Sequence, residues 1–157
     1  MSYISGMVLD RTKTSTEGPE FKLGTIGQAS DGKKYKYVEY SGGAGSVAAA
    51  AGNVAYYFGT SGTSSGDTTK VTSDVTDSVG VGAGVLQAVI PTGGYGWVQI
   101  TGPATLTTAL TAGADGNALT AIGTTDGTLD VSALVTDAVV AYAIDVTAKI
   151  IMCAFPE

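Results

Sequence analysis

The stretch "DGKKYKYVEY", residues 31–40, decides the fold class because it joins a tight-turn signal to a strand pattern. An Asp-Gly pair tolerates the positive φ angles that hairpin turns demand. The alternating positions of residues 34–40 form two faces: Tyr35, Tyr37 and Glu39 on one, and Lys36, Val38 and Tyr40 on the other. The stretch therefore predicts a turn followed by a β-strand.

The same rhythm extends along the chain, where short segments rich in Val, Ile, Thr and Tyr are separated by Gly, Asp, Asn and Pro. We expect further strands within residues 53–59, 69–75, 84–90, 95–101, 104–110, 117–122, 128–135, 138–145 and 148–155. Asp-Gly pairs in residues 113–117 and 124–128 mark additional turns. The best helix candidate, residues 46–51, is short. This pattern favours a mainly β fold, a compact antiparallel β-barrel or β-sandwich, over a parallel βαβ fold.

The chain of 157 residues is the size of one domain. Residues 1–24 mix apolar and charged side chains without a strand-turn rhythm, and we expect an extended N-terminal arm there. Residues 25–157 are expected to form a single β domain, with the Gly/Ser/Thr-rich residues 59–70 as a surface loop. Because glycine takes 23 positions, large side chains are few and the core is thin. We expect partner subunits to complete part of the burial.

The charge distribution argues against several classes of partner. The net charge is −6, and residues 41–157 carry two lysines against nine acidic residues. Such an acidic body predicts no binding to nucleic acid, which needs clustered Lys or Arg. No apolar run approaches the roughly 18 residues that span a bilayer, and the N-terminal residues do not resemble a secretory signal. We therefore expect a soluble protein that is made in the cytoplasm and has no membrane partner.

The sequence contains no catalytic constellation. Histidine is missing, which removes Ser-His-Asp and Cys-His arrangements and the most common metal ligand. Two carboxylate pairs remain, Asp74 with Asp77 and Asp126 with Asp130, and we interpret all four as turn and strand-end residues. Residues four apart on a strand lie roughly 13 Å apart, too far for a single metal ion or a retaining glycosidase pair.

Two other motifs also have structural interpretations. Residues 41–46, "SGGAGS", lack the lysine that a phosphate-binding loop requires. Cys153 is the only cysteine and lies in an apolar run, where a buried thiol is expected. We therefore expect a protein that is not an enzyme and that has no cofactor and no metal site.

The stretch "YGWVQIT", residues 95–101, holds the only tryptophan. Strand alternation places Tyr95 and Trp97 on one face and the core-forming Val98 and Ile100 on the other. The two aromatic rings then have three interpretations: they pack on another sheet of the domain, anchor an interface with a subunit or partner, or form a sugar-stacking platform. Glycines 93, 94 and 96 allow close backbone approach of whatever covers the rings.

Several of these stretches carry a resemblance to a known family. The segments "DGKKYKYVEY", "NVAYYF" and "VGVGAGVLQAVIPTGGYGWVQITGPATL", followed by a closing pair of Val-rich strands, resemble the capsid decoration (cement) proteins of tailed bacteriophages. The resemblance covers roughly residues 24–155, and "YGWVQ" is its most specific element. It implies a virion structural protein, without enzymatic activity, that binds the outer surface of the capsid. Such a protein stabilises the shell by bridging major capsid protein subunits, often as a homotrimer.

The resemblance leads to a set of candidate interface residues. They combine the strand aromatics with side chains of the arm, which we infer to act as a strap on the capsid: Tyr3, Ile4, Met7, Val8, Arg11, Tyr95 and Trp97. The alternative function is a carbohydrate- or receptor-binding β module of a phage fibre, motivated by Trp97 and eight tyrosines. A third class, a hydrolase using a carboxylate pair, depends only on the aspartates named above.

Overall fold

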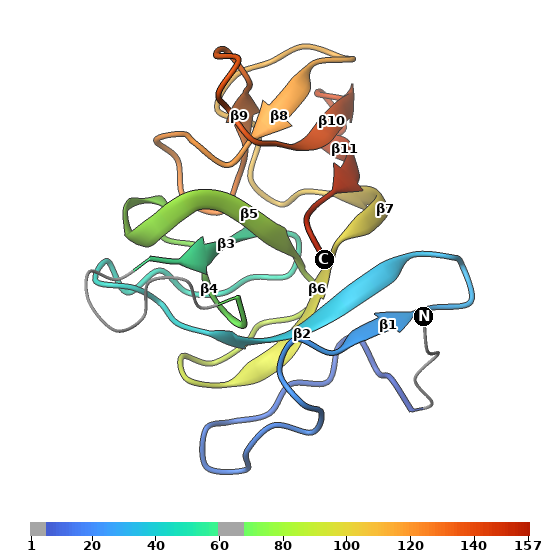
Figure 1. Cartoon of the computed structure of the whole chain (residues 1–157), viewed down its shortest axis with the longest axis vertical. Coiled ribbons are helices and arrows are strands. Elements are labelled where there is room, and N and C mark those ends of the chain that lie inside the picture. The colour runs from blue at the N-terminus through green and yellow to red at the C-terminus, as the bar shows by residue number, and fades with distance from the viewer. Residues whose placement is uncertain (1–5, 60–67) are drawn as a thin grey trace.

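The computed structural model of the protein describes residues 6–59 and 68–157, and these residues form an almost entirely β structure (Figure 1). No α-helix occurs among them, and one 3-10 turn, η1, spans Val75–Asp77. The eleven strands are β1 (Ile26–Gln28), β2 (Lys34–Tyr40), β3 (Val54–Phe58), β4 (Lys70–Thr72), β5 (Ser78–Leu86), β6 (Tyr95–Gln99), β7 (Thr101–Thr105), β8 (Ala118–Thr120), β9 (Asp130–Val131), β10 (Val139–Asp145) and β11 (Ile150–Ala154). The mainly β fold expected from the sequence is confirmed.

The first half of the chain closes into a five-stranded barrel. The strands follow the order β2-β4-β3-β5-β6, and β6 pairs back onto β2, while β1 lies beside the first residues of β2. All neighbours are antiparallel except β2 and β4, which pair in parallel through Glu39 with Lys70 and Tyr40 with Val71. A closed ring with an odd number of strands cannot be antiparallel throughout, so one parallel contact is required.

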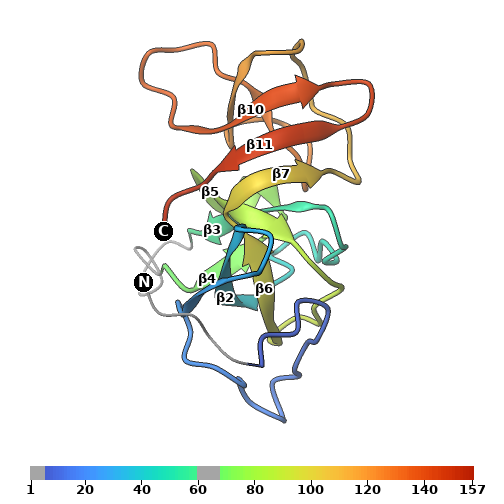
Figure 2. The same cartoon turned by 90° about the vertical axis from the view of Figure 1, so that its right-hand side faces the viewer.

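The second half of the chain forms an antiparallel sheet of five strands with the order β7-β11-β10-β8-β9. Ile100 alone separates β6 from β7, so the chain passes from the barrel into the second sheet. The second sheet lies on one side of the barrel, and Figure 2 shows its strands β10, β11 and β7 lengthwise and side by side. One hydrophobic core joins the two parts, because barrel residues such as Val98 belong to the same buried cluster as Leu119 and Ile151.

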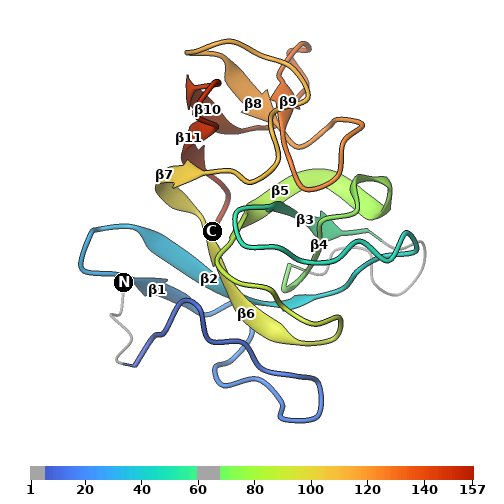
Figure 3. The ribbon, with the colours of Figure 1, turned by 180° about the vertical axis from the view of Figure 1, so that it is seen from behind.

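The long connection between β8 and β9 fastens the second sheet to the barrel (Figure 3). The Thr128 amide donates to the Tyr56 hydroxyl at 2.9 Å, and the same hydroxyl donates to the Thr128 carbonyl. Gly127, at φ +69°, donates to the Ser73 carbonyl and accepts from the Val54 amide. The predicted Asp-Gly turn is therefore present, and its function is to seat this loop on the barrel.

Most strand predictions are confirmed, and four are wrong in extent. The strand expected at 69–75 ends at Thr72, and Val75 begins η1. Residues 34–40 form β2 as predicted. The strand expected at 84–90 begins earlier, at Ser78, and ends at Leu86. The segment 104–110 contributes only its first two residues to β7, and the segment 128–135 only the two residues of β9. Residues 46–51 form no helix.

The N-terminal segment, residues 6–24, has little regular structure, but it lies along the barrel instead of reaching away from it (Figure 1). Lys13 pairs with Tyr95 through two backbone hydrogen bonds of 3.0 and 2.8 Å. The Gly24 amide donates to the Tyr37 carbonyl, and the Glu20 amide donates to the Tyr37 hydroxyl. These contacts hold the segment against the outer face of β2 and β6.

Candidate functional site: the outer face of the second sheet

The tryptophan singled out by the sequence is a core residue. Trp97 is only 1% exposed and forms an aromatic cluster with Tyr35 and Tyr37 on the outer face of the barrel. The Trp97 and Tyr37 ring centroids are 5.0 Å apart. These rings are not exposed to solvent, and they do not pack on another sheet of the domain. The covering element is the N-terminal segment of the same chain, so Trp97 is not available as an exposed anchor.

Residues of the arm supply that cover. Met7, Leu9, Phe21 and Leu23 pack against the aromatic cluster, as does the partly buried Tyr95. The Phe21 ring meets Trp97 at a centroid distance of 5.3 Å. The missing side chain of Gly94 admits the segment, because a Cβ atom there would lie 2.5 Å from the Lys13 carbonyl oxygen.

The other predicted interface residues of the arm are not brought together with Trp97. Val8 is exposed, and Arg11 points to solvent and pairs with Glu20 at 2.8 Å. Tyr3 and Ile4 lie outside the residues that the structure describes. A strap formed by the whole segment would have to leave the aromatic cluster and expose it to water.

The aspartates serve the structure around the glycine loop. Asp74 accepts hydrogen bonds from Thr76 and from the Gly45 amide, and Asp77 accepts from the Ala44 amide. The Thr76 hydroxyl, with the amides of Gly45, Thr76 and Asp77, holds the pKa of the Asp74 carboxyl below its usual value. The loop amides that could have bound a phosphate are thus occupied by the protein's own carboxylates.

The remaining reactive groups are also built into the fold. Asp126 accepts from the Val75 amide at 2.9 Å, and Asp130 accepts from the amide of Val131. Burial raises the pKa of the Cys153 thiol to about 12, which keeps it protonated. Within residues 6–59 and 68–157, no group of three acidic, cysteine or histidine side chains is placed to hold a metal ion.

The second sheet presents a different kind of surface. Its inner side chains, among them Ala141 and Ile151, are buried in the core. The alternate residues face outward and are paired across the strands, with Tyr142 opposite Met152 and Met152 opposite Pro103. We define the outer face of the second sheet by these residues and their neighbours on the same side of β7, β10 and β11: Thr101, Pro103, Thr105, Tyr142, Ile144, Ile150, Met152 and Ala154.

The outer face is mainly apolar and uncharged, and the described residues leave its centre exposed. Tyr142 is 49% exposed, Ile144 43% and Met152 41%. No residue of the set defined above is an acid or a base that is charged at neutral pH, and Asp145 and Lys149 lie at the turn that joins β10 to β11. Contiguous apolar surface of this kind marks a contact with another molecule more often than a solvent boundary.

The sequence contains an indication that the outer face is apolar, which the assignment of strands alone does not reveal. Residues 138–145 and 148–155 are apolar at both odd and even positions. A strand with apolar residues on both sides is expected to be covered on both sides. In this chain the core covers one side, and the described residues leave the other side open.

No protein-family model, no curated protein and no solved structure matches the chain. None of the secondary-structure elements in the described ranges is a helix long and apolar enough to cross a bilayer.

Proposed function

We propose that the protein is a capsid decoration protein of a tailed bacteriophage, which binds the outside of the head as a homotrimer and bridges major capsid protein subunits. The observation that carries the proposal is the outer face of the second sheet, an uncharged apolar surface centred on Tyr142 and Met152. An adhesive protein needs such a surface. The resemblance of residues 24–155 to decoration proteins supplies the identity of the partner.

The mechanism follows from the chemistry of this surface. Covering Tyr142, Ile144 and Met152 with a partner removes apolar area from water, at about 25 cal/mol per Å². No charged group of the outer face must be desolvated in the process, so little opposes the contact. Each copy needs only a modest affinity, because joined subunits raise the effective concentration of the remaining contacts.

The buried position of Trp97 guides the choice between the two candidate functions. A sugar-stacking platform requires an exposed aromatic ring, and this ring lies beneath residues of the N-terminal segment. The carbohydrate-binding alternative therefore loses Trp97, one of the two features that motivated it, and would have to use tyrosines such as the half-exposed Tyr142. We also place the capsid contact on the second sheet, not on the arm, because the described part of the arm is engaged with its own barrel.

The test uses heads of the virus that encodes the chain, assembled without this protein. The purified protein should co-sediment with the heads and raise their resistance to heat. A Tyr142→Lys, Met152→Lys double variant should lose binding by tenfold or more, because a buried contact would then have to desolvate two charges. A Val89→Lys variant is the matched control, since Val89 is 66% exposed and lies on the barrel. Failure of the unmodified protein to sediment with the heads would reject the proposal.

A further inference from the structure

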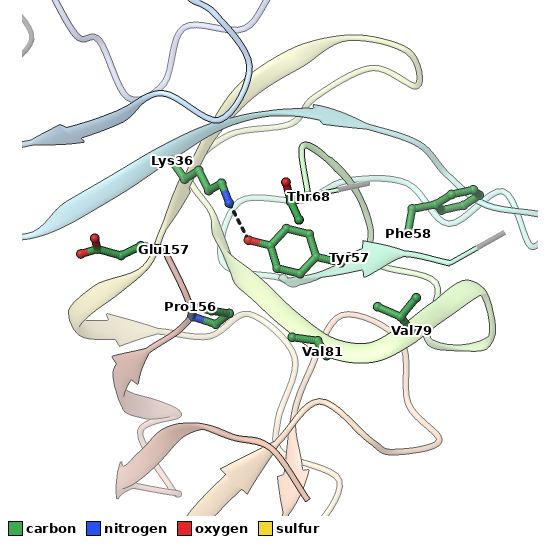
Figure 4. Close-up of a pocket in the computed structure, with 8 residues that line it drawn as sticks. All are labelled: Lys36, Tyr57, Phe58, Thr68, Val79, Val81, Pro156 and Glu157. Carbon is green, nitrogen blue, oxygen red and sulfur yellow. Dashed lines mark hydrogen bonds between the residues drawn. The ribbon is translucent and has the colours of Figure 1, made fainter. Parts of the chain in front are cut away.

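A cavity of about 400 Å³ opens at the barrel between β2, β3 and β5, next to the last two residues of the chain (Figure 4). Its walls are mainly apolar, and its lining residues are Lys36, Tyr57, Phe58, Thr68, Val79, Val81, Pro156 and Glu157. The cavity shares no lining residue with the outer face of the second sheet.

The unusual member of the lining is Lys36. Strand alternation along β2 places Lys36 on the same side as Val38 and Tyr40, which are core residues. The lysine is 5% exposed, although charged side chains are rarely this deeply buried. Its amine donates to the Tyr57 hydroxyl at 2.8 Å and lies 5.0 Å from the centre of the Tyr57 ring, and the two side chains point toward each other in Figure 4.

Within residues 6–59 and 68–157, no carboxylate oxygen lies within 4 Å of the Lys36 nitrogen, whereas Lys34 is paired with Glu157 and Lys70 with Glu39. A buried cation with one neutral partner is costly, because most of its hydration is lost without a compensating charge. The Tyr57 hydroxyl accepts from Lys36, and among the described residues no acceptor takes its own proton. The Lys36 ammonium and the Tyr57 hydroxyl thus both face a mainly apolar cavity as hydrogen-bond donors, and among the described residues the charge of Lys36 has no carboxylate partner.

We propose that this cavity binds a monocarboxylate with a compact apolar body. One carboxylate oxygen would accept from Lys36 and the other from Tyr57, which suits the two oxygens of a carboxylate. The apolar body would lie against Val79, Val81 and Pro156. This site is independent of the proposed function and would operate whether or not the protein binds a capsid.

Isothermal titration calorimetry on the full chain tests the proposal, with sodium octanoate as the probe. Octanoate should bind with one site per chain, and 1-octanol and octylammonium should bind at least tenfold more weakly, because they lack the negative charge. This comparison needs no variant. Absence of octanoate binding at millimolar concentration, or equal binding of 1-octanol, would overturn the proposal.

Variants then locate the site. Lys36→Met keeps the length of the side chain and should weaken octanoate binding by tenfold or more, the loss expected for one charge-assisted hydrogen bond. Lys70→Met is the matched control, because Lys70 also lies near an aromatic ring, 5.5 Å from the centre of Phe58, but does not line the cavity. Octanoate binding unchanged in a folded Lys36→Met variant would refute the assignment.

The segment before Thr68 provides a last control. Asp67 lies outside the described residues and directly precedes Thr68, a residue of the cavity lining; the lining's own carboxylate, Glu157, is paired with Lys34. Asp67→Asn should leave octanoate binding within twofold of the unmodified protein. Octanoate binding that occurs only in the Asp67→Asn variant would mean that the chain supplies its own counter-ion, and the proposal would fall.

Discussion

The barrel and the second sheet each have one face that points away from the shared core. The chain covers this face on the barrel and leaves it exposed on the second sheet. On the barrel, the aromatic cluster of Tyr35, Tyr37 and Trp97 is covered by residues 6–24. On the second sheet, Tyr142 and Met152 remain open. The covered face contributes to the stability of the single chain, whereas the open face can contribute only when another molecule covers it.

The largest expected difference between the two faces concerns their aromatic residues. Trp97→Ala should lower the free energy of unfolding by about 3–5 kcal/mol, since a large buried side chain is removed and a cavity remains. Tyr142→Ala should cost less than about 0.5 kcal/mol, because the ring is half exposed. Urea denaturation followed by far-UV circular dichroism measures both. An equal loss in the free energy of unfolding for the two substitutions would contradict the view that one face is covered and the other exposed.

A second experiment tests whether residues 6–24 are the cover. Phe21 contacts both Tyr37, at a centroid distance of 5.5 Å, and Trp97. Phe21→Ala should destabilise the protein by about 2 kcal/mol, the value of one large apolar side chain removed from a partly buried site. It should also shift the fluorescence of Trp97 to longer wavelength, as water reaches the indole.

The control for this experiment is Leu134→Ala, because Leu134 is exposed and belongs to the second half of the chain. Neither the stability nor the fluorescence should change in that variant. An unshifted Trp97 spectrum in Phe21→Ala would indicate that the segment does not shield the cluster in solution.

A smaller effect is expected at the glycine loop of the barrel, where Asp74 caps η1. The folded state lowers the pKa of Asp74, so this carboxylate stabilises the protein above its unfolded pKa of about 3.9. That contribution is lost as the pH falls through the lower, folded value. Asp74→Ala should cost about 1 kcal/mol at pH 7, and the difference from the unmodified protein should shrink below pH 4.

The pH dependence can be traced to its largest cause. Thr76→Val removes the hydroxyl that donates to Asp74 at 2.6 Å. Its free energy of unfolding should therefore fall less between pH 7 and pH 3 than that of the unmodified protein, as expected for Asp74→Ala. Chemical denaturation at pH 3 and pH 7 makes the comparison. A constant stability difference between Asp74→Ala and the unmodified protein across this range would contradict the assignment.

Sequence patterns predicted those parts of the fold that local chemistry determines. The Asp-Gly turn at residues 31–32 and the alternation of residues 34–40 lead directly to β2. The core-facing Val98 and Ile100 were also identified from alternation. The arm contained an unused signal, because Met7 with Leu9, and Phe21 with Leu23, alternate like residues that cover an apolar surface.

The errors arise where distant segments decide the structure. The strand β5 contains glycines that resemble a loop, yet Gly82 is required for packing, because a Cβ atom there would lie 2.7 Å from the Phe155 ring. The segment 104–110, rich in Thr and Leu, resembles a strand, but Thr107 instead bonds to the carbonyls of Ala51 and Gly52 beyond the end of β7. Neither partner can be identified from the local sequence.

The site was only partly predictable for a similar reason. Alternation grouped Tyr95 with Trp97 correctly but could not show that residues of the N-terminal segment cover them. The outer face of the second sheet depends on the cross-strand partners of β10 and β11, which the sequence does not state. Alternation grouped Lys36 with Val38 and Tyr40 but did not show that this face is inward, and the cavity beside Lys36 is formed by β3, β5 and the C-terminal residues.

Oxidative footprinting of the methionines on assembled heads tests most directly whether the outer face of the second sheet is the contact surface. Met152 is 41% exposed in the free chain, whereas Met7 packs on the aromatic cluster and serves as an internal reference. We predict that oxidation of Met152 slows by at least tenfold when the protein is bound to heads, with Met7 unchanged. Oxidation of Met152 at the same rate in the free and the bound protein would contradict the account.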